Sequence, residues 1–489
     1  MEMRSSFLVS VAMLAACSSS GGPSAEPDAG PGGDGGGEEA GLTCEGKSGS
    51  RLRQLVRDHD DGSSEVVHLV DSERGLQCVF ATAPDGQLRC MPRVDQDKVY
   101  GGILRYLDSS CSQPIASVDS EAHPVLFRYS VPQGESCNQR FLPVYADVGA
   151  VTDIAEGDQI YFRNPQGDCA AATASSATYY QLGEPIPPES FVAGSESWTE
   201  GGRLSMRSID AEDGARLCDV LGQLHDTELE GAACGLDRAE DGAIRCLPPG
   251  PFLSEYFSDD DCTQALSLAQ SDTCRPVSYV AASAPAECDR LQVRRMGDTV
   301  TSQLYWDPAG TCQTFDPVDT ARFSLPGPVV AADSFAEIRR EYTRVGERLE
   351  RGDLVGEGVR LHRTRWRDTT LDIPCGFATA ADGVERCLPA TDPYDGAAIF
   401  AGTRYTDPDC SVGILVAWYR PDCNDTRPAY VRELVGETAV IHQAGDEHPG
   451  PFYANAGTGC VAAPADDAHL SLGPVVDPAT FASGVERLE

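Results

Sequence analysis

The side chains in this sequence with the most distinctive chemistry are its nineteen cysteines. Fifteen of them recur as three sets of five, and in each set the first two are twelve positions apart. No CxxC pair occurs, so the usual spacing of a zinc site or a dithiol redox centre is missing. Many cysteines without metal spacing indicate disulfides and an oxidising compartment. We therefore expect a disulfide framework, with no metal site and no cofactor.

The first cysteine, Cys17, belongs to an N-terminal segment discussed below, and the other eighteen could form nine disulfides. Cys218 and Cys288 have no counterparts in the other sets, so we expect them to pair with each other. The disulfide candidates are Cys44, Cys78, Cys90, Cys111, Cys137, Cys169, Cys218, Cys234, Cys246, Cys262, Cys274, Cys288, Cys312, Cys375, Cys387, Cys410, Cys423 and Cys460.

Other residue types give no catalytic constellation. The histidines fall at different places in the three sets, and neither an HExxH motif nor a G-x-S-x-G elbow is present. Acidic turns occur at 58–61 and 259–261, but neither has EF-hand spacing, so turn capping is favoured over calcium binding. Glycosidase carboxylates are not singled out, because 76 acidic residues always include close pairs. We predict no catalytic residue.

The twelve-position cysteine pair belongs to a stretch that occurs three times. The copies read CVFATAPDGQLRCMP at 78–92, CGLDRAEDGAIRCLP at 234–248 and CGFATAADGVERCLP at 375–389. The Asp-Gly in each predicts a hairpin turn. If Asp85-Gly86 were a two-residue turn, Cys90 would face Ala81 rather than Cys78. Either the loop is wider, centred on the residue before Asp85, or the cysteines have other partners.

Around this stretch the whole chain repeats with a period of about 150 residues, far longer than a solenoid repeat. Short runs rich in β-branched and aromatic residues, such as EVVHLV and GILVAWY, alternate with glycine and proline turns. The pattern predicts an all-β fold of three Cys-rich modules. A propeller-like closed array is favoured, and three tandem antiparallel β-domains are the alternative. At most one short helix is expected, within 334–351.

The expected divisions are 1–17 as a targeting segment, 18–43 as a Gly/Ser/Pro/Asp tether, and modules at 44–194, 195–338 and 339–489. Each module opens with an Arg-Leu strand, at Arg51, Arg203 and Arg348. A fourth copy at Arg487-Leu488 has no module after it. Because an unpaired terminal strand would be an exposed edge, we expect 485–488 to pair either with the third module or with the first.

The first seventeen residues contain Arg4, an apolar core and then Leu-Ala-Ala-Cys ending at Cys17. This segment resembles the lipobox of bacterial lipoproteins. With the tether and the D-G-x-x-R-C-[LM]-P signature, the chain resembles Cys-rich repeat lipoproteins of the bacterial envelope. The resemblance implies that Cys17 carries the lipid, and Ser18 after it implies the outer membrane or cell surface. The tether would span about 28 Å on average.

The net charge of −38 excludes a nucleic-acid partner, because nucleic acids require a basic face. The membrane, reached through the lipid anchor, is the expected partner. The leading interpretation is a non-enzymatic envelope lipoprotein with a structural or ligand-binding role, because the modules repeat structural residues and share no catalytic type. The alternative is a secreted hydrolase, for example a carbohydrate-active one, on a propeller-like fold.

Overall fold

The computed structural model describes residues 44–489 apart from short internal segments. In the described part every regular element is a β-strand or a short 3₁₀ turn, which confirms the all-β prediction. None of the elements described there is a helix long and apolar enough to cross a bilayer. The residues outside the description are 1–43, 95–97, 119–123, 134–139, 165–166, 200–201, 219–223, 230–231, 249–252, 270–277, 284–289, 308–310, 317–321, 392–397, 420–426, 456–459 and 464–466.

Each module contributes one antiparallel meander to a long central sheet. The first meander is β1 (Leu52–His59), β2 (Ser64–Asp71), β3 (Leu76–Thr82) and β4 (Leu88–Pro92). The second is β14 (Leu204–Ala211), β15 (Arg216–Cys218), β16 (Leu224–Asp226), β17 (Ala232–Arg238) and β18 (Ile244–Leu247). The third is β27 (Leu349–Gly356), β28 (Val359–Asp368), β29 (Ile373–Thr379) and β30 (Glu385–Pro389). In β1 and β14 the same positions are buried, so equivalent strands turn equivalent faces to the core.

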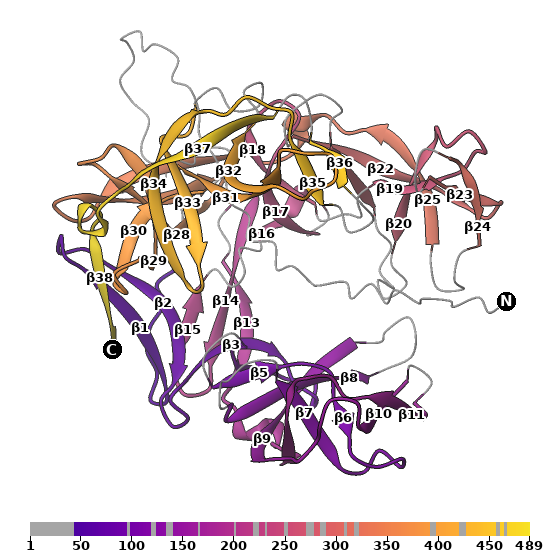
Figure 1. Cartoon of the computed structure of the whole chain (residues 1–489). Helices are drawn as coiled ribbons and strands as arrows, with labels where there is room; N and C mark the ends of the chain where they lie inside the picture. Colours follow the sequence, from indigo (N-terminus) through magenta and orange to yellow (C-terminus); the bar gives the residue numbers. More distant parts are fainter. Residues whose placement is uncertain are drawn as a thin grey trace, which may run out of the picture.

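Three linking strands join the meanders: β13 (Ala193–Trp198), β26 (Ile338–Arg344) and β38 (Ser483–Leu488). β13 pairs with β4 and β14, and β38 pairs with β30 and β1. The C-terminal strand therefore pairs with both of the partners that the sequence offered for it, and Figure 1 shows it beside β1. This confirms the prediction that the fourth Arg-Leu copy is a paired strand.

The two end strands of the central sheet, β18 and β26, also meet. Arg245 in β18 forms an antiparallel bridge with Glu337, which precedes β26. The Cys246 amide donates to the Ala336 carbonyl at 2.9 Å. The same bond recurs at the other two linking strands, from Cys90 to Val192 and from Cys387 to Ala482.

Between each meander and its linking strand the chain forms a separate sheet, which we call an insert. Figure 1 shows the first insert at the bottom, the second at the right and the third along the top. The first insert contains β5 (Val99–Gly101), β6 (Arg105–Tyr106), β7 (Pro114–Val118), β8 (Leu126–Gln133), β9 (Arg140–Val151), β10 (Gln159–Arg163), β11 (Cys169–Thr173) and β12 (Thr178–Pro185). The second contains β19 (Leu253–Phe257), β20 (Ala265–Ala269), β21 (Tyr279–Ser283), β22 (Leu291–Val300), β23 (Leu304–Trp306), β24 (Gln313–Phe315) and β25 (Arg322–Val329).

The third insert contains β31 (Ala398–Tyr405), β32 (Gly413–Tyr419), β33 (Tyr430–Val435), β34 (Thr438–Glu447), β35 (Tyr453–Asn455), β36 (Cys460–Ala462) and β37 (Ala468–Val475). Five of these strands close into a small barrel, because β31 pairs antiparallel with β32 at one side and parallel with β33 at the other. Short 3₁₀ turns occur after each insert, as η1 (Pro188–Ser190), η4 (Ala332–Ser334) and η5 (Pro478–Thr480), and after β16 as η3 (Thr227–Leu229).

Two fold expectations need correction. The structure does not show a propeller: the linking strands β13 and β38 pair on both sides, so the modules share one sheet rather than stacking separate blades. The helix expected within 334–351 is wrong, because 338–344 is β26 and 349–356 is β27. The Arg and Glu residues of this segment have good helix propensity. However, β26 pairs with β27 along its full length, from Ile338 opposite Gly356 to Arg344 opposite Glu350.

Candidate functional site

The threefold signature builds the frame of the molecule. In the second copy, Asp241 accepts from the Ala243 amide and pairs with Arg245 at 2.7 Å. The Arg245 guanidinium also donates to the Phe335 carbonyl at 2.7 Å, which fastens the hairpin to the segment before the linking strand. Arg89 and Arg386 repeat this bond to Phe191 and Phe481. These charged residues hold the hairpin in place.

The opening Arg-Leu dipeptide has a second structural role. Arg51 pairs with Asp71 at 2.6 Å and donates to the Ser190 carbonyl in the 3₁₀ turn. The equivalent groups are Arg203 with Asp226 and Ser334, and Arg348 with Asp368 and Thr480. Asp226 and Asp368 are fully buried, so each carboxylate is held by its arginine away from water.

The hairpin turn of one module holds the start of another. Asp213 of the second module accepts from the Leu52 amide of the first at 2.6 Å. Asp61 of the first module accepts from the Leu349 amide of the third at 2.6 Å. In the remaining pair, the Glu357 carbonyl of the third module accepts from the Leu204 amide of the second. These contacts link the modules in a cycle.

The acidic turns cap backbone amides, the role that the sequence analysis favoured for them. Asp259 accepts from the Thr263 and Gln264 amides at 3.0 and 2.9 Å, and Asp108 and Asp407 do the same in the other inserts. The hydrogen bond from Thr263 is the largest cause that lowers the pKa of Asp259. In the part of the chain that the structure describes, no three His, Cys, Asp or Glu side chains are grouped so as to hold a metal ion.

Seven disulfides lie within the described residues. The repeated pairs are Cys78–Cys90, Cys234–Cys246, Cys375–Cys387, Cys111–Cys169, Cys262–Cys312 and Cys410–Cys460. The prediction that Cys218 pairs with Cys288 is wrong, because Cys218 bonds Cys44, 174 residues away in the sequence. Spacing between repeats could not reveal this bond, since neither cysteine has a counterpart. The predicted lipid site Cys17 and the candidates Cys137, Cys274, Cys288 and Cys423 lie outside the described residues.

The signature hairpin settles the question of register. Thr82 is the last residue paired before the turn, opposite Leu88, so the loop is wider than two residues and is centred on Asp85 itself. Cys78 therefore lies opposite Pro92, and its disulfide to Cys90 crosses the ladder diagonally, with the Cα atoms 5.3 Å apart.

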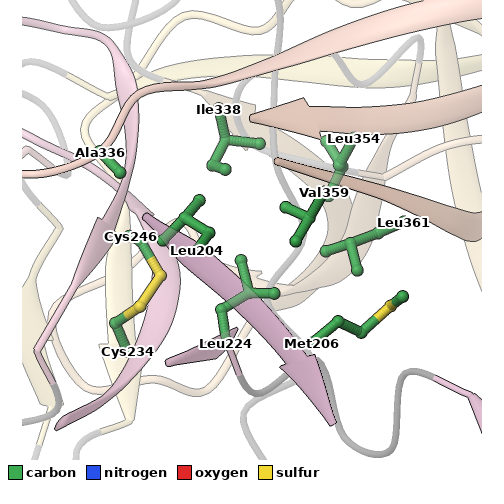
Figure 2. Packing of buried hydrophobic residues seen from close by; sticks show 10 residues of the cluster. All are labelled: Leu204, Met206, Leu224, Cys234, Cys246, Ala336, Ile338, Leu354, Val359 and Leu361. Carbon is green, nitrogen blue, oxygen red and sulfur yellow. A yellow bond between two sulfur atoms is a disulfide. The ribbon is translucent and has the colours of Figure 1, made fainter. Parts of the chain in front are cut away.

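The modules differ from one another at their seams, the places where a hairpin packs on the next meander. Two of the three seams are apolar. The seam between the second and third modules is shown in Figure 2 and consists of Leu204, Met206, Leu224, Cys234, Cys246, Ala336, Ile338, Leu354, Val359 and Leu361. The seam between the first and second includes Leu69, Phe80, Ile209 and Ala211.

The third seam, between the third and first modules, has polar groups at the same register positions. Arg57 occupies the position that Ile209 has in the second module and Leu354 in the third. Glu65 lies opposite Arg57 and occupies the position of Leu217 and Leu361. Arg57 pairs with Glu65 at 2.6 Å and with Glu486 at 2.8 Å. Burial would raise the pKa of Glu65, but the neighbouring His59 ring, the Trp366 N–H and the Arg57 charge outweigh burial and lower the pKa.

Within this polar seam a serine and a histidine are in contact. Ser63 Oγ lies 2.8 Å from His59 Nδ1 and donates to Asp61 at 2.6 Å. The His59 side chain has no exposed surface, and Ser63 is 5% exposed. The His59 ring is stacked on the Phe377 ring, with 4.2 Å between the ring centroids. A substrate could not reach this serine, and its proton is directed to Asp61 rather than to the histidine. The contact is therefore structural.

A groove of about 630 Å³ lies where the described chain begins. Its lining includes Cys44, Glu45, Lys47, Ser197, Ser208 and Arg216. The Cys44–Cys218 disulfide fixes the first described residues to β15, and Lys47 forms a two-way backbone bridge with Arg216. This volume is within the range of small-molecule sites.

The register places the polar groups of the groove on one face. Lys47 is opposite Arg216, Arg216 is opposite Asp210, and Ser197 is opposite Ser208. Directly opposite residues of neighbouring strands point to the same side of a sheet. Asp210 holds Arg216 through two hydrogen bonds of 2.7 and 3.0 Å, and the bond from Arg216 is the largest cause that lowers the pKa of Asp210.

The architecture defines a disulfide-rich, all-β repeat protein whose modules share a sheet. A family model matches residues 34–481, and the chain belongs to that family, a family of unknown function (DUF7481). No curated protein and no solved structure matches the chain significantly.

Proposed function

We propose that this chain is a lipid-anchored, non-enzymatic protein of the bacterial cell envelope that binds a small polar ligand in the groove beside Cys44–Cys218. The lipobox at Cys17 and the tether that follows it support anchoring. The disulfides support an oxidising location outside the cytoplasm. The D-G-x-x-R-C-[LM]-P signature serves as a scaffold element common to the three modules.

The observation that carries the binding role is where the groove lies. The charged residues common to the three modules are used to hold hairpins and module starts, as Arg245 does with Phe335 and Arg51 with Asp71. The groove instead depends on a bond that the modules do not share, Cys44–Cys218, which holds Lys47 beside Arg216. In a repeat protein a site with one function is expected where the repeats differ.

Two experiments test this proposal. The variant Cys17→Ala should shift the protein from the detergent phase to the aqueous phase; unchanged partitioning would contradict the anchor. For binding, mature protein is screened by thermal unfolding against neutral sugars, acidic sugars, amino acids and nucleotides. A ligand at a hundred times its Kd should stabilise the protein by about 2.7 kcal/mol. A panel in which no member raises the unfolding midpoint would contradict the binding role.

A further inference from the structure

The two cations of the groove are placed as a like-charge pair. Lys47 and Arg216 exchange both backbone hydrogen bonds, at 3.0 and 2.9 Å, so their side chains leave the same face from opposite positions. Like charges directly opposite one another destabilise a sheet. Asp210 forms an ion pair with Arg216, and the charge of Lys47 also acts on this carboxylate, although no ion pair joins Lys47 to it among the described residues.

An anion between these two cations would offset their repulsion. The same groove also presents acceptors, which a bare anion would not favour. Glu45 is a carboxylate in the lining, and the Ser197 hydroxyl there lies 2.7 Å from the Ser208 hydroxyl. Asp210, on the same face, accepts from Ser197 and Arg216. A ligand suited to both sets carries one anionic group for the cations and several O–H donors for the Glu45 carboxylate and the serine hydroxyls.

We infer that the groove binds an acidic saccharide, with its carboxylate or phosphate at Lys47 and Arg216 and its hydroxyls toward Ser197, Ser208 and Glu45. This inference rests on the proposed binding role and specifies its ligand. A volume of about 630 Å³ accommodates more than a single ion, which agrees with a sugar rather than inorganic phosphate. Lys47 matters all the more because the sequence contains only one other lysine, Lys98, and has a net charge of −38.

The test is titration calorimetry of the mature protein with matched ligands. Trigalacturonate is compared with its methyl ester, which keeps the rings and removes the charges, and glucose 6-phosphate is compared with glucose. The acid should bind at least about tenfold more tightly than the ester, because charge-assisted hydrogen bonds are the strong ones. The two charged probes show whether the source is a carboxylate or a phosphate. Inorganic phosphate should bind weakly, and binding as tight as that of the sugars would overturn the saccharide assignment.

Three variants complete the test. Lys47→Gln should remove most of the preference for acid over ester, and Lys98→Gln, which alters the only other lysine, should leave it intact. Glu45→Gln should weaken binding of the ester, because an amide oxygen is a poorer acceptor for the sugar hydroxyls than a carboxylate. Equal binding of acid and ester, or a Lys47→Gln variant with its preference unchanged, would overturn this inference. If neutral or non-sugar members of the thermal panel still bind, the proposed binding role stands without the acidic-saccharide assignment.

Discussion

Trp366 of the third module donates its indole N–H to Glu65 of the first, with Nε1 2.9 Å from Oε2, across a separation of 301 residues. This bond lies in the one polar seam of a molecule whose other two seams are apolar. Trp366 stands where Leu69 and Leu224 stand in the equivalent hairpins, since each pairs with the first signature cysteine of its module. The polar seam is also where the last strand, β38, meets the first, β1. Its charges therefore distinguish the closing contact of the chain from the other two.

The first prediction concerns Glu65. Glu65→Ala should lower the free energy of unfolding by about 3 kcal/mol, because it leaves the buried Arg57 without its closest partner and the Trp366 N–H without an acceptor. Denaturant unfolding measures the loss. Glu437→Ala, at an exposed turn, is the control and should change stability by less than about 0.5 kcal/mol. A Glu65→Ala loss as small as the control would show that the seam is not a coupled network.

A variant in which the polar seam is made apolar tests whether the charges stabilise the fold or ensure that each module pairs with the correct neighbour. The variant Arg57→Ile/His59→Ala/Glu65→Leu/Trp366→Leu copies the residues of the seam between the first and second modules. Buried ion pairs are often no more stabilising than apolar replacements, so this variant should unfold at or above the wild-type midpoint. With two identical seams it should also form a larger fraction of strand-exchanged oligomers, measured by size exclusion with light scattering. A strongly destabilised variant would refute the equivalence of the seams.

The second prediction concerns the caps between modules. Asp61→Ala should cost about 3 kcal/mol, because the amide of the fully buried Leu349 loses its acceptor. Asp61→Asn keeps a side-chain oxygen and should cost clearly less. A side chain on Gly346 would collide with the same carboxylate, so Gly346→Ala should destabilise in a similar way. Equal midpoints for the Ala and Asn variants, measured by calorimetry, would contradict the cap.

The third prediction concerns the Cys44–Cys218 bond. Peptide mapping of the unreduced protein should recover these two cysteines linked, and a peptide joining Cys218 to Cys288 would contradict the structure. The double variant Cys44→Ser/Cys218→Ser should lose about 2–5 kcal/mol of stability, because the bond closes a long loop. It should also weaken ligand binding, since the bond fixes one wall of the groove.

The fourth prediction concerns pH. Burial, followed by the charges of Arg93 and Arg57, lowers the pKa of His68 to about 4. The unfolded chain, with a histidine pKa near 6.5, therefore binds the proton more readily, and stability falls as pH drops from about 6.5 to 4. The loss should be on the order of 2 kcal/mol. His68→Gln should flatten the profile in this window, and the exposed control His448→Gln should not. A His68→Gln profile identical to wild type would contradict the assignment.

Local patterns in the sequence were sufficient to predict strands but not their global assembly. The Arg487-Leu488 repeat predicted a paired final strand, because a repeated motif needs an equivalent environment, and β38 has it between β30 and β1. The propeller expectation failed because nothing local shows that a linking strand pairs on both sides. The helix expected at 334–351 failed because pairing with β27 outweighs the helix propensity of its charged residues.

The groove was beyond the reach of sequence analysis for a related reason. Lys47 and Arg216 are brought together by a backbone bridge and by the Cys44–Cys218 bond, both between segments distant in the chain. The only available signal was that Cys44 and Cys218 have no equivalents in the other modules. Residues without equivalents in the other modules could have marked the site, although they could not show which residues pair with each other there.

The most direct test of the account is hydrogen–deuterium exchange of the mature protein, alone and saturated with trigalacturonate or with the tightest ligand of the thermal panel. Binding at the groove predicts slower exchange in peptides covering 44–47, 197–199 and 216–218. It predicts no change in the barrel of the third insert. Protection confined to any of the three inserts, or no protection around Lys47 and Arg216 at saturation, would contradict the central claim that ligand recognition lies where the repeats differ.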